Sequence, residues 1–248
     1  MKTSMTSVTF RKKTIPEIVQ LAKLAQLDAV EWGGDIHVPM GDFTAALQAR
    51  TLCEENGLDI SAYGSYYRAT PGEDFLPVLQ TAQMLQCPAI RVWAGTMGSA
   101  ECSPLQRQEI VEQLRSAVQL ATQAECTVAT EYHAWTLTDT LESTLQLLQE
   151  VPGLKTFWQP QAGRTLETNL TELGQLKAYV LNLHVFHWDA QFNRFPLADG
   201  ADLWKQYLHT TVNFNLQSYA TLEFVKDDDE VQFLADAKAL HKLLNNGM

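Results

Sequence analysis

The sequence predicts a single-domain (β/α)8 barrel. Short segments rich in β-branched and apolar residues alternate with amphipathic segments, and eight such pairs follow one another along the chain. Strict alternation of strands and helices favours a parallel sheet, and eight pairs favour its closure into a barrel. The length of 248 residues suits this fold, which takes about 250 residues in one domain. One barrel domain is therefore expected over residues 1–248.

An open, doubly wound sheet is the alternative fold. It would place a glycine-rich, phosphate-binding turn after the first strand, but the residues there are Phe10, Arg11, Lys12 and Lys13. The sequence contains no P-loop, and no linker or low-complexity tract divides it. The closed barrel is therefore preferred.

Eight segments are expected to be strands, because β-branched and aromatic residues favour a packed, pleated sheet. The expected strands are residues 7–10, 29–32, 59–63, 87–93, 127–130, 154–158, 179–186 and 219–224. The fifth of them, TVAT, runs directly into Glu131. Because a carboxylate is costly to bury without a partner, this strand end is the first candidate for a functional position.

Eight segments with helical spacing of apolar residues separate these strands. The expected helices are residues 15–26, 43–56, 75–85, 105–125, 137–151, 170–176, 203–209 and 231–245. Thr14 and Ser103 are the expected N-caps of the first and fourth helices, each with a proline in the first turn. Gly57 is expected to end the second helix in the left-handed conformation, and Thr136 or Thr138 precedes the fifth.

Composition narrows the classes of function. Hydrophobic residues make up 46% of the chain and charged residues 19%, which suits a globular enzyme with a large core. The formal net charge of -11 and the lack of a basic stripe disfavour a nucleic-acid partner. The four cysteines are scattered without a C-x-x-C pair, which is typical of reduced thiols in a cytoplasmic protein. The sequence shows neither a signal peptide nor a bilayer-spanning segment, so no membrane association is expected.

The carboxyl ends of the last four strands carry the most informative side chains. In a barrel of this class the active site lies at that rim, and each of these neighbouring strands brings one donor to it. The donors are Glu131, Gln159, His184 and Glu223. A lone histidine is more often a hydrogen-bonded core residue, and a lone carboxylate at a strand end more often points into solvent. Together, two carboxylates, an imidazole and an amide favour a shared site for a divalent ion such as Mn²⁺, Mg²⁺ or Co²⁺.

Several segments, taken in order, give the chain a family resemblance. They are LDAVEWGG at 27–34, ARTLCEENGLDISAY at 49–63, VATEYHAWTLTDTLEST at 128–144, LNLHVFHW at 181–188, PLADGADLWKQYL at 196–208 and ATLEF at 220–224. With this order and spacing the chain resembles the xylose-isomerase-like TIM-barrel superfamily, which contains sugar and sugar-phosphate isomerases and epimerases. The resemblance extends from about Phe10 to Leu244.

The resemblance implies one divalent metal held by a glutamate, an aspartate, a histidine and a glutamate from successive strands. These positions correspond to Glu131, Gln159, His184 and Glu223. The second departs from the family pattern, because FWQPQAG lacks both the aspartate and the histidine that usually follows three residues later. Gln159 offers an amide oxygen without a negative charge, so a weaker site for Mn, Mg, Co or Zn is expected, or a variant without metal.

The activity implied by the resemblance is isomerisation or epimerisation of a sugar, sugar phosphate or polyol. Such reactions move a proton next to a carbonyl, while a metal polarises that carbonyl. By resemblance, Glu131 and Glu223 are the acid/base pair as well as metal ligands. The expected substrate-binding residues are Glu31, His37, Tyr63, Trp93, His133, Trp158, His187 and Arg194. Arg91 could contact the substrate, but a buried pairing with Glu31 is the alternative.

Aromatic residues near the rim are expected to stack on a sugar and to exclude water. The set is Phe10, Trp32, Tyr63, Tyr66, Trp93, Trp135 and Trp158, and ordinary core packing is the alternative for about half of it. A phosphorylated substrate would need a cationic pocket, for which Arg11, Lys12, Lys13 and Arg68 are the visible candidates. An unphosphorylated sugar or polyol is preferred.

Two other classes of function compete with the isomerase hypothesis. The superfamily also includes AP endonucleases, but these need more metal ligands and a basic DNA-facing surface than a chain of net charge -11 offers. A catalytically silent or metal-free sugar-binding barrel is the second alternative, because of Gln159. Dimers and tetramers are common in the superfamily, so a homo-oligomer is an open expectation.

Overall fold

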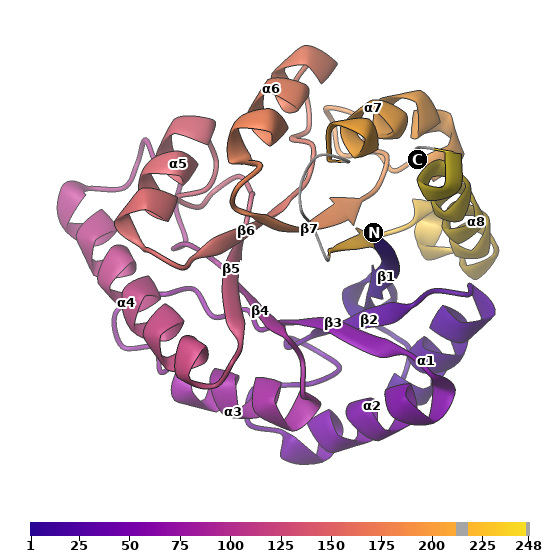
Figure 1. The fold of residues 1–248 in the computed structure, drawn as a ribbon, viewed down its shortest axis with the longest axis horizontal. Helices are drawn as coiled ribbons and strands as arrows, with labels where there is room; N and C mark the ends of the chain where they lie inside the picture. Colours follow the sequence, from indigo (N-terminus) through magenta and orange to yellow (C-terminus); the bar gives the residue numbers. More distant parts are fainter. Residues whose placement is uncertain (212–217, 247–248) are drawn as a thin grey trace.

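The computed structural model describes residues 1–211 and 218–246, and these form a closed (β/α)8 barrel (Figure 1). All eight strands are parallel and pair in sequence order, with β1 next to β8. The strands are β1 (Lys2–Thr6), β2 (Ala29–Gly33), β3 (Asp59–Gly64), β4 (Ala89–Val92), β5 (Thr127–Glu131), β6 (Lys155–Trp158), β7 (Val180–Val185) and β8 (Tyr219–Leu222). The predicted fold class is therefore confirmed.

A ring of α-helices surrounds the barrel (Figure 1). The helices are α1 (Ile15–Leu24), α2 (Phe43–Asn56), α3 (Leu76–Leu85), α4 (Pro104–Gln123), α5 (Leu141–Glu150), α6 (Leu166–Leu176), α7 (Ala201–Thr211) and α8 (Glu230–Asn246). Thr14 and Ser103 form capping boxes at the starts of α1 and α4. Gly57 follows α2 with a φ of 69°, the left-handed conformation that glycine adopts without strain. These three predicted helix boundaries are confirmed.

The first strand lies earlier than predicted. Residues 7–10 form a 3₁₀ turn, and the strand is Lys2–Thr6. The sequence KTSMT lacks an apolar run because its inward side chains are polar; the Ser4 hydroxyl lies 2.9 Å from that of Ser61. Thr6 already pairs with Glu31 at the rim of the barrel, so the residues after it belong to a rim loop.

The fifth helix begins later than predicted. Helix α5 starts at Leu141, where Thr140 accepts a hydrogen bond from the backbone N–H of Ser143. Thr136 and Thr138 do not cap it. Their hydroxyls donate instead to the carbonyls of His133 and Glu131. These bonds fix the backbone just beyond β5, where the functional side chains project. The sixth helix, in contrast, begins at Leu166, earlier than the expected residue 170.

Apolar side chains form two separate layers. The larger lies between the barrel and the helices and includes Trp32, Tyr63 and Trp158. The smaller one consists of Ala62, Ala89, Ala129 and Phe157, whose strand neighbours belong to the first layer. Alternate residues of a strand point to opposite faces, so this second layer fills the inside of the barrel. The polar residues of the rim lie above it.

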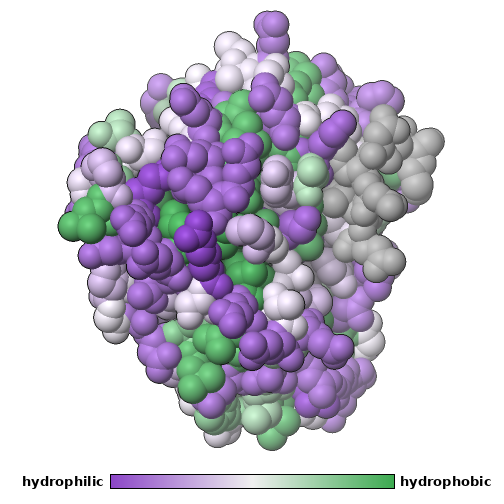
Figure 2. All heavy atoms as spheres, turned by 60° about the vertical axis from the view of Figure 1, so that its left-hand side comes forward, coloured by the Kyte–Doolittle hydropathy of each residue, from purple (hydrophilic) through white to green (hydrophobic). Residues whose placement is uncertain are grey.

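The outer surface carries no sign of a membrane segment. On the face drawn in Figure 2, hydrophilic residues predominate and hydrophobic residues form several separate groups. None of the helices within residues 1–211 and 218–246 has both the length and the apolar character needed to cross a bilayer.

Candidate metal and substrate site

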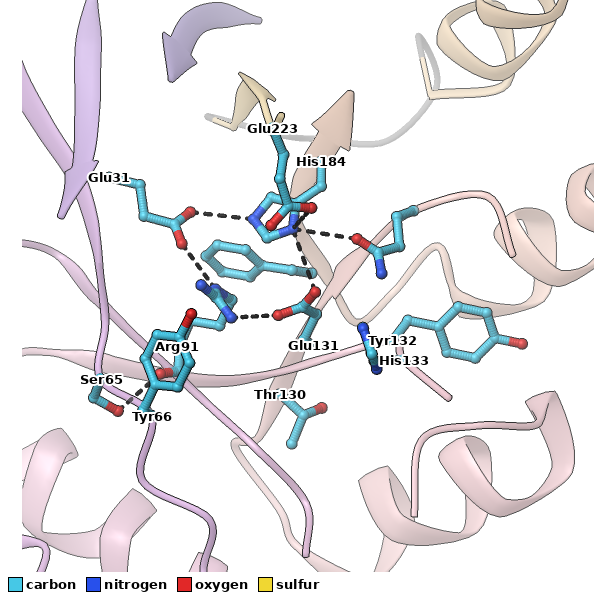
Figure 3. A network of polar contacts seen from close by, with 12 residues as sticks. Glu31, Ser65, Tyr66, Arg91, Thr130, Glu131, Tyr132, His133, His184 and Glu223 are labelled. Atoms are coloured by element: carbon cyan, nitrogen blue, oxygen red, sulfur yellow. Dashed lines mark hydrogen bonds and ion pairs between the residues drawn. The ribbon is translucent and has the colours of Figure 1, made fainter. Parts of the chain in front are cut away.

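Three of the four donors predicted from strands β5 to β8, Glu131, His184 and Glu223, converge at the carboxyl end of the barrel (Figure 3), and Gln159 joins them through a contact with His184. Their common point is Nδ1 of His184. It lies 3.2 Å from Oε2 of Glu223 and 3.7 Å from Oε1 of Glu131. The amide oxygen of Gln159 is 3.3 Å away from the same nitrogen. All four side chains are buried, and the structure brings together the four donors that were expected at this rim.

This arrangement fits a divalent metal ion. Two atoms bound to one ion at about 2.1 Å lie about 3.0 to 3.4 Å apart in octahedral or tetrahedral geometry. The separations between His184 Nδ1 and the oxygens of Gln159, Glu131 and Glu223 range from 3.2 to 3.7 Å, close to these values. A nitrogen with carboxylate and amide oxygens is a donor set suited to Mn²⁺, Mg²⁺, Co²⁺ or Zn²⁺.

A buried pair of charged residues completes the polar cluster on the opposite side of His184. Nε2 of the imidazole donates to Oε2 of Glu31 over 3.2 Å. The other oxygen of Glu31 accepts a 2.8 Å hydrogen bond from Nε of Arg91. The same guanidinium also binds Oε2 of Glu131 through Nη1. The expected pairing of Arg91 with Glu31 is confirmed, and Arg91 additionally reaches Glu131.

Burial and charge act against each other on the pKa values of this cluster. Burial alone would raise the pKa of Glu131, but the positive charge of Arg91 outweighs it and holds that pKa well below its usual range. The pKa of Glu31 is lowered against burial in the same way, by Arg91 and His184. Burial would lower the pKa of His184, yet the carboxylates of Glu223 and Glu31 raise it well above its ordinary value. With their lowered pKa values, Glu131 and Glu31 are carboxylates at neutral pH.

His133 lies just beyond β5 at the edge of the site (Figure 3). Its Nδ1–H donates to the carbonyl of Ala134 over 2.7 Å, so Nε2 is the ring nitrogen that can accept a proton. Its ring packs edge-on against Trp93, with centroids 4.8 Å apart, and Trp93 in turn contacts Tyr66. Trp135 extends this aromatic group and is 66% exposed.

Two residues expected to contact a substrate lie in the hydrophobic core instead. Tyr63 and Trp158 are completely buried in the layer between barrel and helices. The hydroxyl of Tyr63 donates to the carbonyl of Val38, and the ring of Trp158 packs against Tyr207. Each side chain points away from the barrel interior, because its strand neighbour points into it. Phe10 and Trp32, which were expected in the aromatic lining, also belong to this core.

Three other expected contact residues occupy the loops around the site. His37 is buried, and its Nε2–H donates to the carbonyl of Lys13, while burial lowers its pKa. His187 packs against Gly200, where an added Cβ would lie 2.5 Å from its Nδ1. Arg194 binds Asp228 at 2.7 Å and stacks on Phe224. The other ring nitrogen of His37, Nδ1, is buried and has no hydrogen-bond partner among the described residues.

A second network, which was not predicted from the sequence, joins three rim loops. Arg11 binds the carboxylate of Asp35 and donates to the hydroxyl of Tyr66 over 2.9 Å. Tyr66 has a φ of 60°, which is uncommon outside glycine and sets the ring above the site. An arginine, an aspartate and a tyrosine in successive rim loops are the only available signal, and it is a weak one.

Comparison with known proteins agrees with this architecture. The family model described as "Xylose isomerase-like TIM barrel" matches residues 19–243. A 3-dehydroshikimate dehydratase of Bacillus anthracis is 33% identical over 168 residues, which are 62% of this chain and 60% of that enzyme. The matched segment thus spans less than two thirds of the relative's length.

Solved structures extend the comparison to almost the whole chain. The crystal structure of a probable 3-dehydroshikimate dehydratase from Bacillus anthracis has a TM-score of 0.81 at 25% identity, covering 97% of this chain and 99% of that one. The D-psicose 3-epimerase of Clostridium cellulolyticum with D-tagatose has a TM-score of 0.69 at 10% identity, covering 100% and 98%. The second likeness concerns the fold alone.

Proposed function

Because the chain belongs to the xylose isomerase-like TIM-barrel family, we propose that it removes a proton next to the carbonyl of a small polyhydroxylated ketone. Isomerisation or epimerisation of a sugar or polyol follows if the proton returns to carbon. The convergence of Glu131, Gln159, Glu223 and His184 Nδ1 carries this proposal, because it brings metal donors and proton acceptors to one buried point.

The metal would be held by Glu131, Gln159, His184 and Glu223. When bound, a divalent ion polarises a carbonyl and stabilises the negative charge that develops on its oxygen. Three buried carboxylates, including Glu31, face a single guanidinium, that of Arg91. A histidine must be neutral to bind a metal ion, and with His184 in that form two negative charges are left over, which one divalent ion would balance. Without an ion, the raised pKa of His184 lets its own proton balance one of them. This charge balance supports a metal-dependent enzyme although Gln159 is uncharged.

The proton-transfer roles follow from which atoms are free. Glu131 binds Arg91 through one oxygen and has a lowered pKa, so it is a weak base and suits the role of ligand. In residues 1–211 and 218–246, no side chain or backbone group bonds to Oε1 of Glu223 or to Nε2 of His133. We assign proton removal and return to these two groups, with Glu223 retained from the predicted glutamate pair.

The ion pairs of the cationic residues in the loops at the rim favour an unphosphorylated substrate. A groove of about 620 Å³ between the loops after β1 and β8 contains Arg11, Lys12, Lys13 and Arg194. Three of these four cations bind a carboxylate, and Lys13 reaches Glu230 at 2.5 Å; Lys12 has no carboxylate partner among the described residues. Phosphate would have to displace these partners. A neutral polyol needs no such displacement.

A dehydratase is the second candidate, and the 33% identity to a 3-dehydroshikimate dehydratase favours it. It shares the first step, removal of a proton next to a carbonyl. The pathways then separate: the hydroxyl on the adjacent carbon leaves with a proton as water, and a carbon–carbon double bond forms. A cyclic hydroxyketone resembling 3-dehydroshikimate would be its substrate.

One experiment examines the shared step and separates the two outcomes. The purified protein with Mn²⁺ is incubated in D₂O with a panel of ketoses, inososes and 3-dehydroshikimate, and followed by NMR and mass spectrometry. Deuterium next to the carbonyl in a product of unchanged composition supports an isomerase or epimerase; loss of water supports a dehydratase. Glu223→Gln should abolish either reaction, and exposed Glu167→Gln should not. Binding without exchange or elimination for every compound would favour the catalytically silent barrel.

A further inference from the structure

Glu31 and Arg91 close a ring of polar contacts around the candidate metal site. Starting at His184, the ring runs through Nε2 to Glu31, from Glu31 to Arg91, from Arg91 to Glu131, and back to Nδ1 of His184 (Figure 3). We propose that Glu31 and Arg91 are positioning residues that fix the orientation of the two metal-binding side chains they touch. This inference rests on the metal site of the proposed function.

Burial separates this role from contact with a substrate. The side chain of Glu31 is 0% exposed and that of Arg91 is 3% exposed. Both oxygens of Glu31 are already engaged, one by Nε of Arg91 and the other by Nε2 of His184. A substrate would therefore have to break a buried ion pair to reach Glu31, which costs more than binding at an open group. The expected substrate contact of Glu31 is replaced by a contact with the metal ligands.

Glu31 and Arg91 each bind one polar atom of a metal-binding side chain. The other polar atom of that side chain then faces the metal position. Glu31 accepts the proton of Nε2, so the neutral ring that a metal ion requires would carry its lone pair on Nδ1, the atom that faces Glu131, Gln159 and Glu223. Arg91 binds Oε2 of Glu131, so Oε1 is the oxygen left toward Nδ1. A histidine ligand held by a carboxylate through its other nitrogen is a common way to fix a metal-binding tautomer.

Gly64 provides the space that Arg91 needs. The two residues are directly paired across strands β3 and β4. A Cβ on Gly64 would lie 2.7 Å from Nη2 of Arg91 and 3.1 Å from Oε1 of Glu31. The φ of Gly64 is not in the left-handed region, so its small size is what matters. An alanine there would push the guanidinium away without removing any charge.

The experiment measures Mn²⁺ affinity, with free Mn²⁺ followed by its EPR signal, in the wild type and in Glu31→Gln, Arg91→Lys and Gly64→Ala. Loss of such supporting contacts typically weakens metal binding by about 10- to 100-fold. We expect that loss in Glu31→Gln and Gly64→Ala, and a smaller loss in Arg91→Lys, which keeps the charge. Glu172→Gln is the matched control, because it removes a buried carboxylate bound to Arg164 elsewhere in the barrel. Its Mn²⁺ affinity should equal that of the wild type.

Nitrogen NMR of the His184 ring in protein loaded with diamagnetic Zn²⁺ gives a second measurement that a merely structural role would not change. The wild type should show a protonated Nε2, and Glu31→Gln should lose that preference. Folded Glu31→Gln and Gly64→Ala proteins with wild-type Mn²⁺ affinity would overturn the inference and leave the proposed function intact. A wild type that binds no Mn²⁺ would overturn the metal site itself, and the inference with it.

Discussion

The Nδ1 atom of His184 and the amide oxygen of Gln159 lie 3.3 Å apart, on the side of the imidazole that also faces Glu131 and Glu223. Gln159 therefore sits where a metal ligand would sit, but it adds no negative charge. Its amide oxygen comes from the residue directly after β6, held next to the carboxyl ends of β5 and β7.

Replacement of Gln159 by aspartate should strengthen metal binding. The substitution restores a carboxylate at the same strand end, and ligand charge is a main determinant of affinity for hard divalent ions. We expect the Mn²⁺ dissociation constant to fall by about tenfold or more, as measured by isothermal titration calorimetry. Gln161→Asp, two residues later in the same loop, is the control. Equal affinities of Gln159→Asp and the wild type would contradict Gln159 as a ligand.

Replacement of His133 by asparagine should slow catalysis without affecting the metal. A positioned general base or acid contributes about 10²- to 10⁴-fold to rate. Asparagine preserves polarity near Trp93 but has no basic nitrogen, so kcat should fall by that order in the deuterium-exchange assay. Mn²⁺ affinity should stay the same, because His133 is not among the donors around His184 Nδ1. If the variant had the kcat of the wild type, His133 would have no role in proton transfer, and that role would be assigned to Glu223 alone.

Replacement of Tyr63 by phenylalanine should affect stability and leave binding unchanged. The hydroxyl donates a 3.0 Å hydrogen bond to the carbonyl of Val38 in the core. Its loss should cost about 1 kcal/mol of unfolding free energy, measured by chemical denaturation. If Tyr63 contacted the substrate as first expected, KM would rise in this variant while the stability stayed constant.

The pH dependence of stability should report on Asp236, a buried carboxylate of α8 that is not one of the metal donors. Burial raises its pKa above the ordinary value of 3.8, although the N–H of Leu197 and the amide of Gln232 lower it in part. Between 3.8 and the raised value, the folded protein keeps a proton that the unfolded chain has lost. Stability from this group is therefore complete below pH 3.8 and declines as pH rises through that window.

The Asp236→Asn variant has no titrating carboxyl group at this position, so it is the reference against which the stability of the wild type is compared. The difference in unfolding free energy between wild type and Asp236→Asn should favour the wild type most at acid pH and shrink as pH rises. Denaturant titrations at a series of pH values measure it. A difference that grows with pH would mean that the pKa of Asp236 is lowered in the folded protein.

Much of the fold could be predicted because its signals are local. A strand that ends in a polar residue and a helix with a cap can each be seen within about ten residues, and TVATE and the helix after Ser103 both follow this pattern. The first strand was missed because KTSMT places polar side chains inside the barrel, against the usual rule. That exception depends on Ser61, which is distant in the sequence.

The candidate site was predictable in its donors and less so in its surroundings. Glu131, Gln159, His184 and Glu223 could be placed together because parallel strands of a barrel end at one rim. Trp158 could have been excluded by alternation, since it directly precedes the inward-facing Gln159. The bridge from Arg91 to Glu131 depends on side-chain geometry across strands β4 and β5, which local patterns do not encode.

The position of the polar ring limits the routes by which small molecules enter and leave the barrel. The ring crosses the bore from Glu31 on β2 to His184 on β7, and beneath it Phe157 packs with the small side chains of Ala62 and Ala129. The site is thus a pocket with the polar ring at its base, and not a channel through the barrel. Substrate and product must use the same opening of this pocket, so the product has to dissociate before a new substrate binds. The product should therefore act as a competitive inhibitor.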